Sequence, residues 1–210
     1  MIIAVDGPTA SGKGTIAKAL AAHFGLPHLD TGLLYRAVGY QCAQDGGEPN
    51  SLADALAACA FPDNLLDNSE LRSEAVGALA SKVSVHPAVR KALYERQRAF
   101  AEQDGGAVLD GRDIGTVIAP DAHVKLFVTA SVAARAQRRF AEMRSQGRDV
   151  TLEDITTDIA QRDARDMNRA DAPLKPAADA MIFDSTNFGK DEAIEAAIEA
   201  IEERLDRALD

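Results

Sequence analysis

The segment IIAVDGPTASGKGT, residues 2–15, sets the fold class of this chain. Its apolar start, residues 2–5, is short and continuous and is closed by Asp6-Gly7, which predicts a strand buried on both faces of a sheet. Residues 13–24 then carry apolar side chains at helical spacing, and Gly25-Leu26-Pro27 ends that pattern. A buried strand, a glycine-rich loop and a helix therefore follow one another directly, as they do in phosphate-binding loops.

Four further apolar runs predict strands, with helical patterns between them. They cover residues 26–29, 107–109, 124–128 and 180–183. Strands that alternate with helices form parallel sheets, so we predict a P-loop α/β fold whose five-stranded parallel sheet is flanked by helices. The final helical pattern, 191–209, predicts an amphipathic helix that packs on the sheet through Ile194, Ile198, Ile201, Leu205 and Leu209.

Two stretches interrupt this alternation, and we interpret them as insertions into one core. Residues 37–105 form a mostly helical insertion. Residues 140–160 are polar and contain arginines around Gly147, which predicts a hairpin of two helices and a short helical lid. The P-loop core is then expected over residues 1–36, 106–139 and 161–210.

The composition limits the partners of the chain. It has 210 residues and a formal net charge of −10, which disfavours binding to nucleic acid and to anionic membrane surfaces. No apolar run approaches the roughly 18 residues of a membrane span, and the histidines show no metal-ligand spacing. Cys42 and Cys59 lie among small or apolar residues. We expect a cytoplasmic monomer with reduced thiols that acts on small molecules.

The loop Gly7–Thr15 has the chemistry of a triphosphate site. Its glycines let successive backbone N–H groups point inward, and the following helix adds partial positive charge at its N-terminus. Lys13 can reach the β- and γ-phosphates. Gly14 stands where the general motif has Ser or Thr, so Mg²⁺ is expected mainly on phosphates and waters, with Thr15 assisting. ATP is accordingly expected on Gly7, Pro8, Thr9, Ala10, Ser11, Gly12, Lys13, Gly14 and Thr15.

Arginines indicate the kind of acceptor. A GTPase would carry an Asn-Lys-x-Asp motif, which none of the seven lysines supplies, and a motor ATPase would need a longer chain. A kinase for a small acceptor remains. Residues 135–169 contain eight arginines and no lysine, and arginine binds phosphate through paired hydrogen bonds. Part of this set is expected in surface ion pairs. Three arginines that open the predicted lid are expected on the ATP phosphates or the adenine: Arg135, Arg138 and Arg139.

Five segments resemble bacterial cytidylate kinases, in the order in which that family has them. They are Asp6–Thr15, DTGLLYR at 30–36, LDGRDIGT at 109–116, RDARDMNRADAP at 162–173 and ADAMIFDST at 178–186. The resemblance implies a kinase that transfers the γ-phosphoryl group of ATP to CMP or dCMP, with Mg²⁺. It also implies a substrate domain that contains a small antiparallel sheet. Residues 49–90 lack the alternation of such strands, so we expect the insertion at 37–105 to be abridged.

The same resemblance implies which residues meet the acceptor. They are Thr31, Arg36, Ser81, Arg90, Arg112, Asp113, Arg162, Asp166 and Arg169, and those with catalytic roles are Lys13, Arg112, Arg162 and Arg169. The chemistry agrees, because a carboxylate such as Asp113 accepts hydrogen bonds from the amino group of cytosine. Residues 162, 165, 166 and 169 have the spacing of one helix face, which could present arginines to a phosphate or form a ladder of salt bridges. Asp110, at a predicted strand end, could orient Mg²⁺-bound water or form a turn.

Two other interpretations stay open. Another small-acceptor kinase, of the adenylate or shikimate type, would carry the same loop. A nucleotide-binding regulatory protein without catalysis would keep the loop but show no turnover. Rates of ADP formation with CMP, AMP, UMP and shikimate separate these cases.

Overall fold

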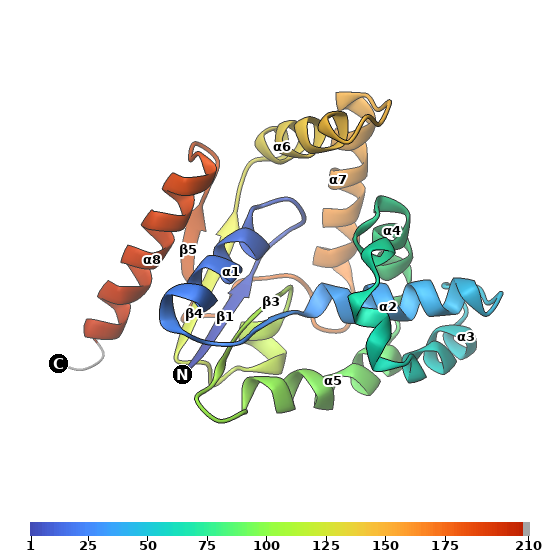
Figure 1. Cartoon of the computed structure of the whole chain (residues 1–210), viewed down its shortest axis with the longest axis horizontal. Helices are drawn as coiled ribbons and strands as arrows, with labels where there is room; N and C mark the ends of the chain where they lie inside the picture. The colour runs from blue at the N-terminus through green and yellow to red at the C-terminus, as the bar shows by residue number, and fades with distance from the viewer. Residues whose placement is uncertain (208–210) are drawn as a thin grey trace. The chain divides into compact units, whose positions relative to one another are not determined.

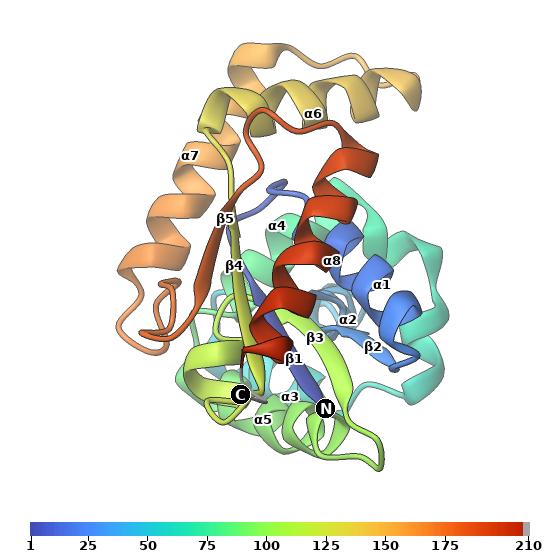
Figure 2. The same ribbon diagram turned by 90° about the vertical axis from the view of Figure 1, so that its left-hand side faces the viewer.

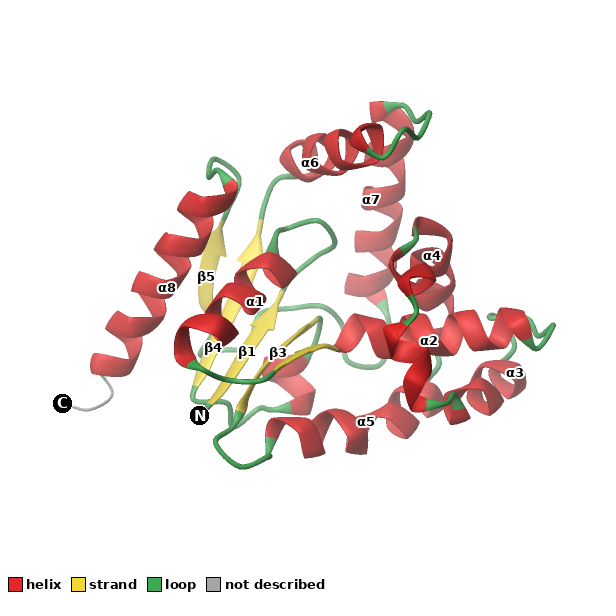
Figure 3. Cartoon of the chain, viewed as in Figure 1, coloured by secondary structure: helices red, strands yellow, loops and turns green. Residues whose placement is uncertain are grey.

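The computed structural model describes residues 1–207 and confirms the predicted fold class. Five strands form one sheet in the order β2-β3-β1-β4-β5. β1 pairs in parallel with β3 and β4, and β4 pairs in parallel with β5 (Figures 1 and 3). The strands are β1 (Ile2–Asp6), β2 (His28–Asp30), β3 (Ala107–Gly111), β4 (Val124–Thr129) and β5 (Met181–Asp184).

β1 is the central strand, and all five of its residues are buried. Ile3 and Val5 pack against two helices, α1 (Lys13–Phe24) and α8 (Lys190–Asp206). These helices cover the same face of the sheet (Figure 2). α8 contacts the core through Ala193, Ala197 and Ile201, with Ile198 and Leu205 beside them, as an amphipathic helix should. Leu209, which the sequence pattern adds to this stripe, lies outside the described residues.

The helices α6 (Val132–Ser145) and α7 (Leu152–Asn168) form a hairpin with a small core of its own. Gly147, at the turn, has a φ of 74°, a backbone conformation that glycine adopts without strain. Four buried apolar side chains join the two helices: Ala136, Met143, Ile155 and Ile159. The predicted lid, residues 140–160, covers the end of α6, the turn and the first half of α7.

The chain divides into two compact units. The first comprises Met1–Leu29 and the chain from Ala101 onward, and the second comprises Asp30–Phe100. The second unit is built of helices and short 3₁₀ turns: α2 (Thr31–Gln44), α3 (Leu52–Ala57), η1 (Ala58–Ala60), η2 (Asp63–Asp67), η3 (Ser69–Arg72), α4 (Glu74–Val83) and α5 (Pro87–Ala101). None of the helices within residues 1–207 is both long and apolar enough to cross a membrane.

A single π turn, η4 (Ile114–Ile118), leads from β3 toward β4. The N–H groups of Val117 and Ile118 donate to the carbonyl oxygen of Asp113 at 2.8 and 3.2 Å. The N–H group of Ala119 donates to Ile114 O at 2.7 Å. π turns are rare and often mark functional sites, and this one follows Arg112 and Asp113 directly.

Candidate active site

The loop Gly7–Thr15 has the close approach and the open helix start that a phosphate site needs. A Cβ at Gly7 would lie 2.1 Å from Val128 O, so only glycine fits there. Gly12, the N-cap of α1, has a φ of 90°, which lets the chain turn into the helix. Within the described chain no side chain caps this helix, and its first turn carries no acidic residue. Its first N–H groups are therefore available to an anion.

Ser11 adds a buried hydroxyl inside the loop. Its side chain is fully buried, and Ser11 Oγ has no hydrogen-bond partner among residues 1–207. The same oxygen would lie 3.2 Å from a Cβ at Gly7, so it faces across the loop. A buried polar atom without a partner is costly, and a phosphate oxygen in the loop would satisfy it.

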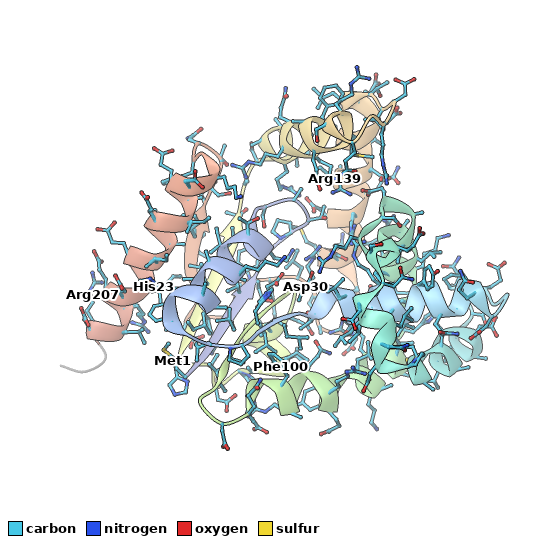
Figure 4. All side chains as sticks on the ribbon, in the orientation of Figure 1. Met1, His23, Asp30, Phe100, Arg139 and Arg207 are labelled. Carbon is cyan, nitrogen blue, oxygen red and sulfur yellow. The ribbon has the colours of Figure 1, made fainter. Side chains whose placement is uncertain are left out.

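A cavity of about 500 Å³ opens beside the loop. This volume is within the range of small-molecule sites, about 300–1,000 Å³. Its walls come from the loop and α1, from α6, where Figure 4 shows Arg139, and from the segment between β5 and α8. The lining residues are Ala10, Ser11, Gly12, Thr15, Ile16, Arg138, Arg139, Glu142, Ser185, Phe188, Gly189, Lys190 and Ala193.

Ser185 ties three parts of this wall together and is itself buried. Its Oγ donates to Ser11 O at 2.9 Å, which fixes the loop. Arg138 donates to Ser185 Oγ at 3.0 Å and to Ser185 O at 2.5 Å. Ser185 therefore couples the loop to α6 across a long sequence separation, a role that the sequence alone did not indicate.

Arg135 stabilises the backbone of the loop. Its guanidinium forms a bidentate, buried ion pair with Asp163 of α7, at 3.1 and 2.5 Å. It also donates to Thr9 O at 3.2 Å and to Ala130 O at 2.9 Å. Of the arginines expected at ATP, Arg138 and Arg139 line the cavity, whereas Arg135 holds the backbone of the loop.

Asp110 lies beside the start of α1. A Cβ at Gly14 would be 3.6 Å from Asp110 Oδ2. The other oxygen, Asp110 Oδ1, is 2.7 Å from His28 Nε2, and both side chains are largely buried. Asp110 is therefore held at the loop by His28, a contact between residues 82 positions apart that the sequence pattern did not reveal.

The end of β3 and the end of α7 bring together the acceptor residues expected in the first unit. Arg112 Nε donates to Asp166 Oδ2 at 2.9 Å. Arg169 Nη2 lies 3.7 Å from Asp113 Oδ1, and both side chains are only 6% exposed. These two arginine–carboxylate pairs, together with Arg162, whose charge acts on Asp166, form one cluster. We call it the arginine cluster: Arg112, Asp113, Arg162, Asp166 and Arg169.

Charge holds the arginine cluster together. Burial raises the pKa of Asp166, but the charge of Arg112 and its hydrogen bond, together with Arg162 and Arg169, outweigh burial and hold this pKa below its ordinary value of 3.8. Asp166 is therefore ionised at neutral pH, and three guanidinium groups surround it.

The predicted helix face is partly wrong. α7 ends at Asn168, and Arg169, its C-cap, has an extended backbone with φ −65° and ψ 142°. Arg169 thus reaches the cluster from the chain beyond the helix, where its Nε donates to Ala172 O at 2.6 Å. Arg165 is exposed. The helix ends one residue too early for four residues to share a face.

The second unit holds the other four residues expected at the acceptor. Arg36 Nη1 donates to Leu71 O and Ser73 O at 2.7 and 2.8 Å, and its Nη2 would lie 2.9 Å from a Cβ at Gly77. Ser81, one helical turn beyond Gly77 on α4, is buried. The other two are Thr31, buried at the start of α2, and Arg90, buried with its guanidinium 6.0 Å from the ring centroid of Tyr35.

Proteins of known family match this chain over almost its full length. A model of the cytidylate kinase family matches residues 3–203. Cytidylate kinase of Azorhizobium caulinodans is 52% identical over 202 residues, which cover 96% of this chain and 98% of the relative. Cytidylate kinase of Methylocella silvestris is 51% identical and covers 98% of this chain and 96% of the relative. A crystal structure of an uncharacterized protein from Eubacterium ventriosum shares the fold, with a TM-score of 0.54, 16% identity, and coverage of 96% and 98%.

The resemblance drawn from five sequence segments is therefore confirmed by the match over almost the full length. Because the family model spans residues 3–203 and both relatives exceed half identity, this chain belongs to the cytidylate kinase family.

Proposed function

We propose that this protein transfers the γ-phosphoryl group of ATP to the phosphate of CMP or dCMP, which gives ADP and CDP or dCDP. The observation that carries this proposal is the arginine cluster, which lies in the same compact unit as the glycine-rich loop. A loop that fits a triphosphate and a buried set of arginines and carboxylates are together what a nucleotide-to-nucleotide transfer requires.

ATP would lie with its phosphates on Gly7–Thr15 and its base in the cavity beside the loop. Lys13 would reach the β- and γ-phosphates. Arg138 and Arg139 line the cavity and would contact the base or the phosphates. Arg135 would act through the carbonyl group of Thr9.

The residues at the loop fit Mg²⁺. This ion takes oxygen ligands, usually one or two carboxylates together with phosphates and waters. Asp110 supplies a carboxylate near Gly14, and Thr15, which is exposed and lines the cavity, supplies a hydroxyl. Bound there, Mg²⁺ would neutralise negative charge on the transferring phosphates.

The acceptor nucleotide would use the arginine cluster. Asp113 would accept hydrogen bonds from the amino group of cytosine, and Arg112 would donate to the acceptor atoms of the base. Arg162 and Arg169 would bind the acceptor phosphate, and Asp166 would hold these arginines and meet the sugar. Thr31, Arg36, Ser81 and Arg90 of the second unit would complete binding of the acceptor.

The chemical step needs no strong base. The second pKa of a phosphate monoester is about 6, so an oxygen of CMP is already ionised near pH 7. This oxygen forms a bond to the γ-phosphorus as the bond from that phosphorus to the β–γ bridging oxygen breaks, and ADP leaves with the electron pair. The protein contributes position, positive charge and exclusion of water. We propose that the α6–α7 hairpin closes as a lid and that the unit at Asp30–Phe100 is the acceptor-binding insertion.

A panel of acceptors tests the proposal. The purified protein is incubated with MgATP and CMP, dCMP, UMP, AMP or shikimate, and ADP is measured. CMP or dCMP should give the highest kcat/KM. Lys13→Ala should lower turnover by at least about a hundredfold, because one charged contact to the transition state is worth about 3–4 kcal/mol. Lys18→Ala, on the exposed side of α1, should change little.

Two results would overturn this function. A higher kcat/KM with AMP or shikimate would assign another acceptor. ATP binding without turnover on any acceptor would assign a regulatory role.

A further inference from the structure

Asp6 is a buried carboxylate between the glycine-rich loop and the arginine cluster. It ends β1, opposite Gly111 of β3 and Phe127 of β4, and is only 5% exposed. Its Oδ1 accepts a hydrogen bond from Ile114 N, and its Oδ2 accepts one from Gly115 N, each at 2.8 Å. One side chain therefore binds two successive N–H groups at the start of η4.

These two hydrogen bonds determine where η4 begins. The first N–H groups of any helical turn have no acceptor within the turn, and here they are buried. At the C-terminal side of η4, the N–H groups of Val117 and Ile118 donate to Asp113 O. Asp113 is thus held in two ways. Asp6 binds the N–H groups of the two residues that follow Asp113, and the π turn closes on the carbonyl group of Asp113.

The start of η4 packs closely against the side chains of Asp6 and Lys125. A Cβ at Gly115 would lie 3.4 Å from Asp6 Oδ2 and 3.2 Å from Lys125 Cδ. Lys125 is held in place because its Nζ donates to Pro120 O and to both carboxylate oxygens of Asp179. The start of η4 therefore lies directly on Asp6 and the stem of Lys125, and a Cβ at Gly115 would require these neighbours or η4 to shift.

From this geometry we propose that Asp6 is a positioning residue for base recognition, which sets Arg112 and Asp113 for cytosine by holding the start of η4 with both carboxylate oxygens. The inference rests on the proposed function, in which Arg112 and Asp113 contact the base. Asp6 itself contacts no substrate in this scheme. Only a carboxylate can accept from two parallel N–H groups in this way, because an amide offers one oxygen and turns a donor toward the other N–H.

The surroundings of Asp6 make this role sensitive to pH. Burial, with a smaller contribution from the charge of Asp113, raises the pKa of Asp6 to about 7, although the N–H groups of Gly115 and Ile114 and the charge of Arg112 oppose the rise. The charged groups on the neighbouring elements are Arg112 and Asp113 before η4, Asp110 on β3, and Lys125 on β4, whose ammonium is paired with Asp179. Below pH 7 a protonated Asp6 would lose one acceptor oxygen to its own O–H.

The ionised form of Asp6 does not stabilise the fold. Its folded-state pKa of about 7 lies above the ordinary 3.8, so between these values the folded protein keeps a proton that the unfolded chain releases. The contribution of Asp6 to stability therefore falls as pH rises toward 7. Asp6→Asn should consequently fold, which separates its effect on recognition from an effect on folding.

The experiment measures the ratio of kcat/KM for CMP to kcat/KM for UMP between pH 6 and pH 8. Both acceptors carry the same phosphate, so its ionisation cancels in the ratio. In the wild type the ratio should fall as pH drops, with a midpoint near 7. In Asp6→Asn it should be about tenfold lower at pH 8, the lower end of what one base contact discriminates, and should not change with pH. The KM for ATP should change less than about threefold.

Two further variants complete the test. Gly115→Ala should lower the ratio to a smaller extent, because its Cβ would come within 3.4 Å of Asp6 Oδ2 and 3.2 Å of Lys125 Cδ and would push η4 away from them. Asp121→Asn, an exposed aspartate beyond η4, should leave the ratio unchanged. A wild type that phosphorylates CMP and shows a flat ratio from pH 6 to pH 8 overturns the inference. Wild-type discrimination in Asp6→Asn or in Gly115→Ala also overturns it. Absence of CMP turnover in the wild type would instead reject the proposed function.

Discussion

Asp166 shows how a single carboxylate can organise an anion site. It pairs with Arg112 at 2.9 Å, and the charges of Arg162 and Arg169 also lower its pKa. Without Asp166, three guanidinium groups would repel one another in a place with little solvent. Asp166 would thus keep the arginines assembled before a phosphate arrives.

We expect Asp166→Asn to lose stability and acceptor binding together. Removal of one member of a buried ion pair costs about 3–5 kcal/mol, and misplaced arginines should lower kcat/KM for CMP about a hundredfold. Thermal unfolding and steady-state kinetics check both effects. Asp158→Asn, exposed on the same helix, is the control and should behave like the wild type.

The sign of the pH dependence follows from the lowered pKa. The stabilisation by Asp166 is complete above its ordinary pKa of 3.8 and is lost as pH falls through its folded-state pKa. The stability difference between wild type and Asp166→Asn should therefore be constant from pH 5 to pH 8 and shrink below pH 4. A difference that grows on acidification would contradict this account of the charge balance.

Residues proposed to contact a ligand could be named from the sequence more readily than the residues that support them. Lys13, Arg112 and Asp113 lie in motifs whose side chains have an evident task. Ser185 and Asp163 act by contact with segments far away in sequence, such as the 174 positions between Ser185 and Ser11. Nothing local to such a residue shows its partner, because the contact exists only after the sheet has formed.

At the scale of elements, the hairpin α6–α7 joins the loop to the arginine cluster. Arg135 of α6 binds Thr9 O, and its partner Asp163 lies one turn before Asp166 on α7. A chain of contacts therefore runs from the glycine-rich loop through α7 to Arg112. Through these contacts, binding of ATP to the loop would affect the arginine cluster.

A double-mutant cycle tests the Arg135–Asp163 pair. Each single variant, Arg135→Met and Asp163→Leu, should lose about 3–5 kcal/mol of stability, because it leaves a buried charge. The double variant should lose less than the sum of the two, since its apolar side chains can pack together. Its KM for ATP should still exceed that of the wild type, because Thr9 O has lost its donor.

The matched control is an exposed pair at the far end of the same hairpin, Arg144 and Asp149, whose side chains are 3.5 Å apart. Exposed pairs contribute at most about 1 kcal/mol, so Arg144→Met and Asp149→Leu should have small, additive effects. Additive losses for Arg135 and Asp163 as well would show that the two residues do not act as a pair.

The periodicity of the sequence predicted which helices and strands form, but it predicted their ends less accurately. The five strands were predicted from short apolar runs bounded by turn residues, and α1 and α8 from their helical spacing. The second strand was expected over residues 26–29 and spans His28–Asp30. The end of α7 was missed, because Arg162–Arg169 keeps a helical spacing beyond the point where the chain leaves the helix at Asn168. A tertiary contact, Leu174 N to Asp166 O at 2.9 Å, takes the carbonyl group that one more helical turn would use.

At the scale of the whole molecule, the excess of negative charge and the paired arginines occupy different places. The net charge is −10, and the acidic side chains of α8 are exposed. Arg112, Arg135 and Arg169 instead lie in ion pairs within the first unit. The acidic surface disfavours polyanions at long range, whereas in the proposed function the arginines would bind a single nucleotide at close range. The net charge thus predicts which partners are disfavoured, and the positions of the arginines predict which partner is bound.

The two compact units give the last prediction, because the residues proposed for ATP lie in one unit and those proposed for CMP lie in both. Hydrogen exchange with ATP alone should slow at Gly7–Thr15, in the middle of α6 and at residues 185–189, where the cavity is lined. Exchange in α2 and α4 should not change. CMP should slow exchange in η4, at the end of α7 and in α4. A ligand at a hundred times its Kd stabilises the bound state by about 2.7 kcal/mol, which is readily detected in this way. If ATP alone protected α4 as strongly as CMP does, the division of substrates between the units would be wrong.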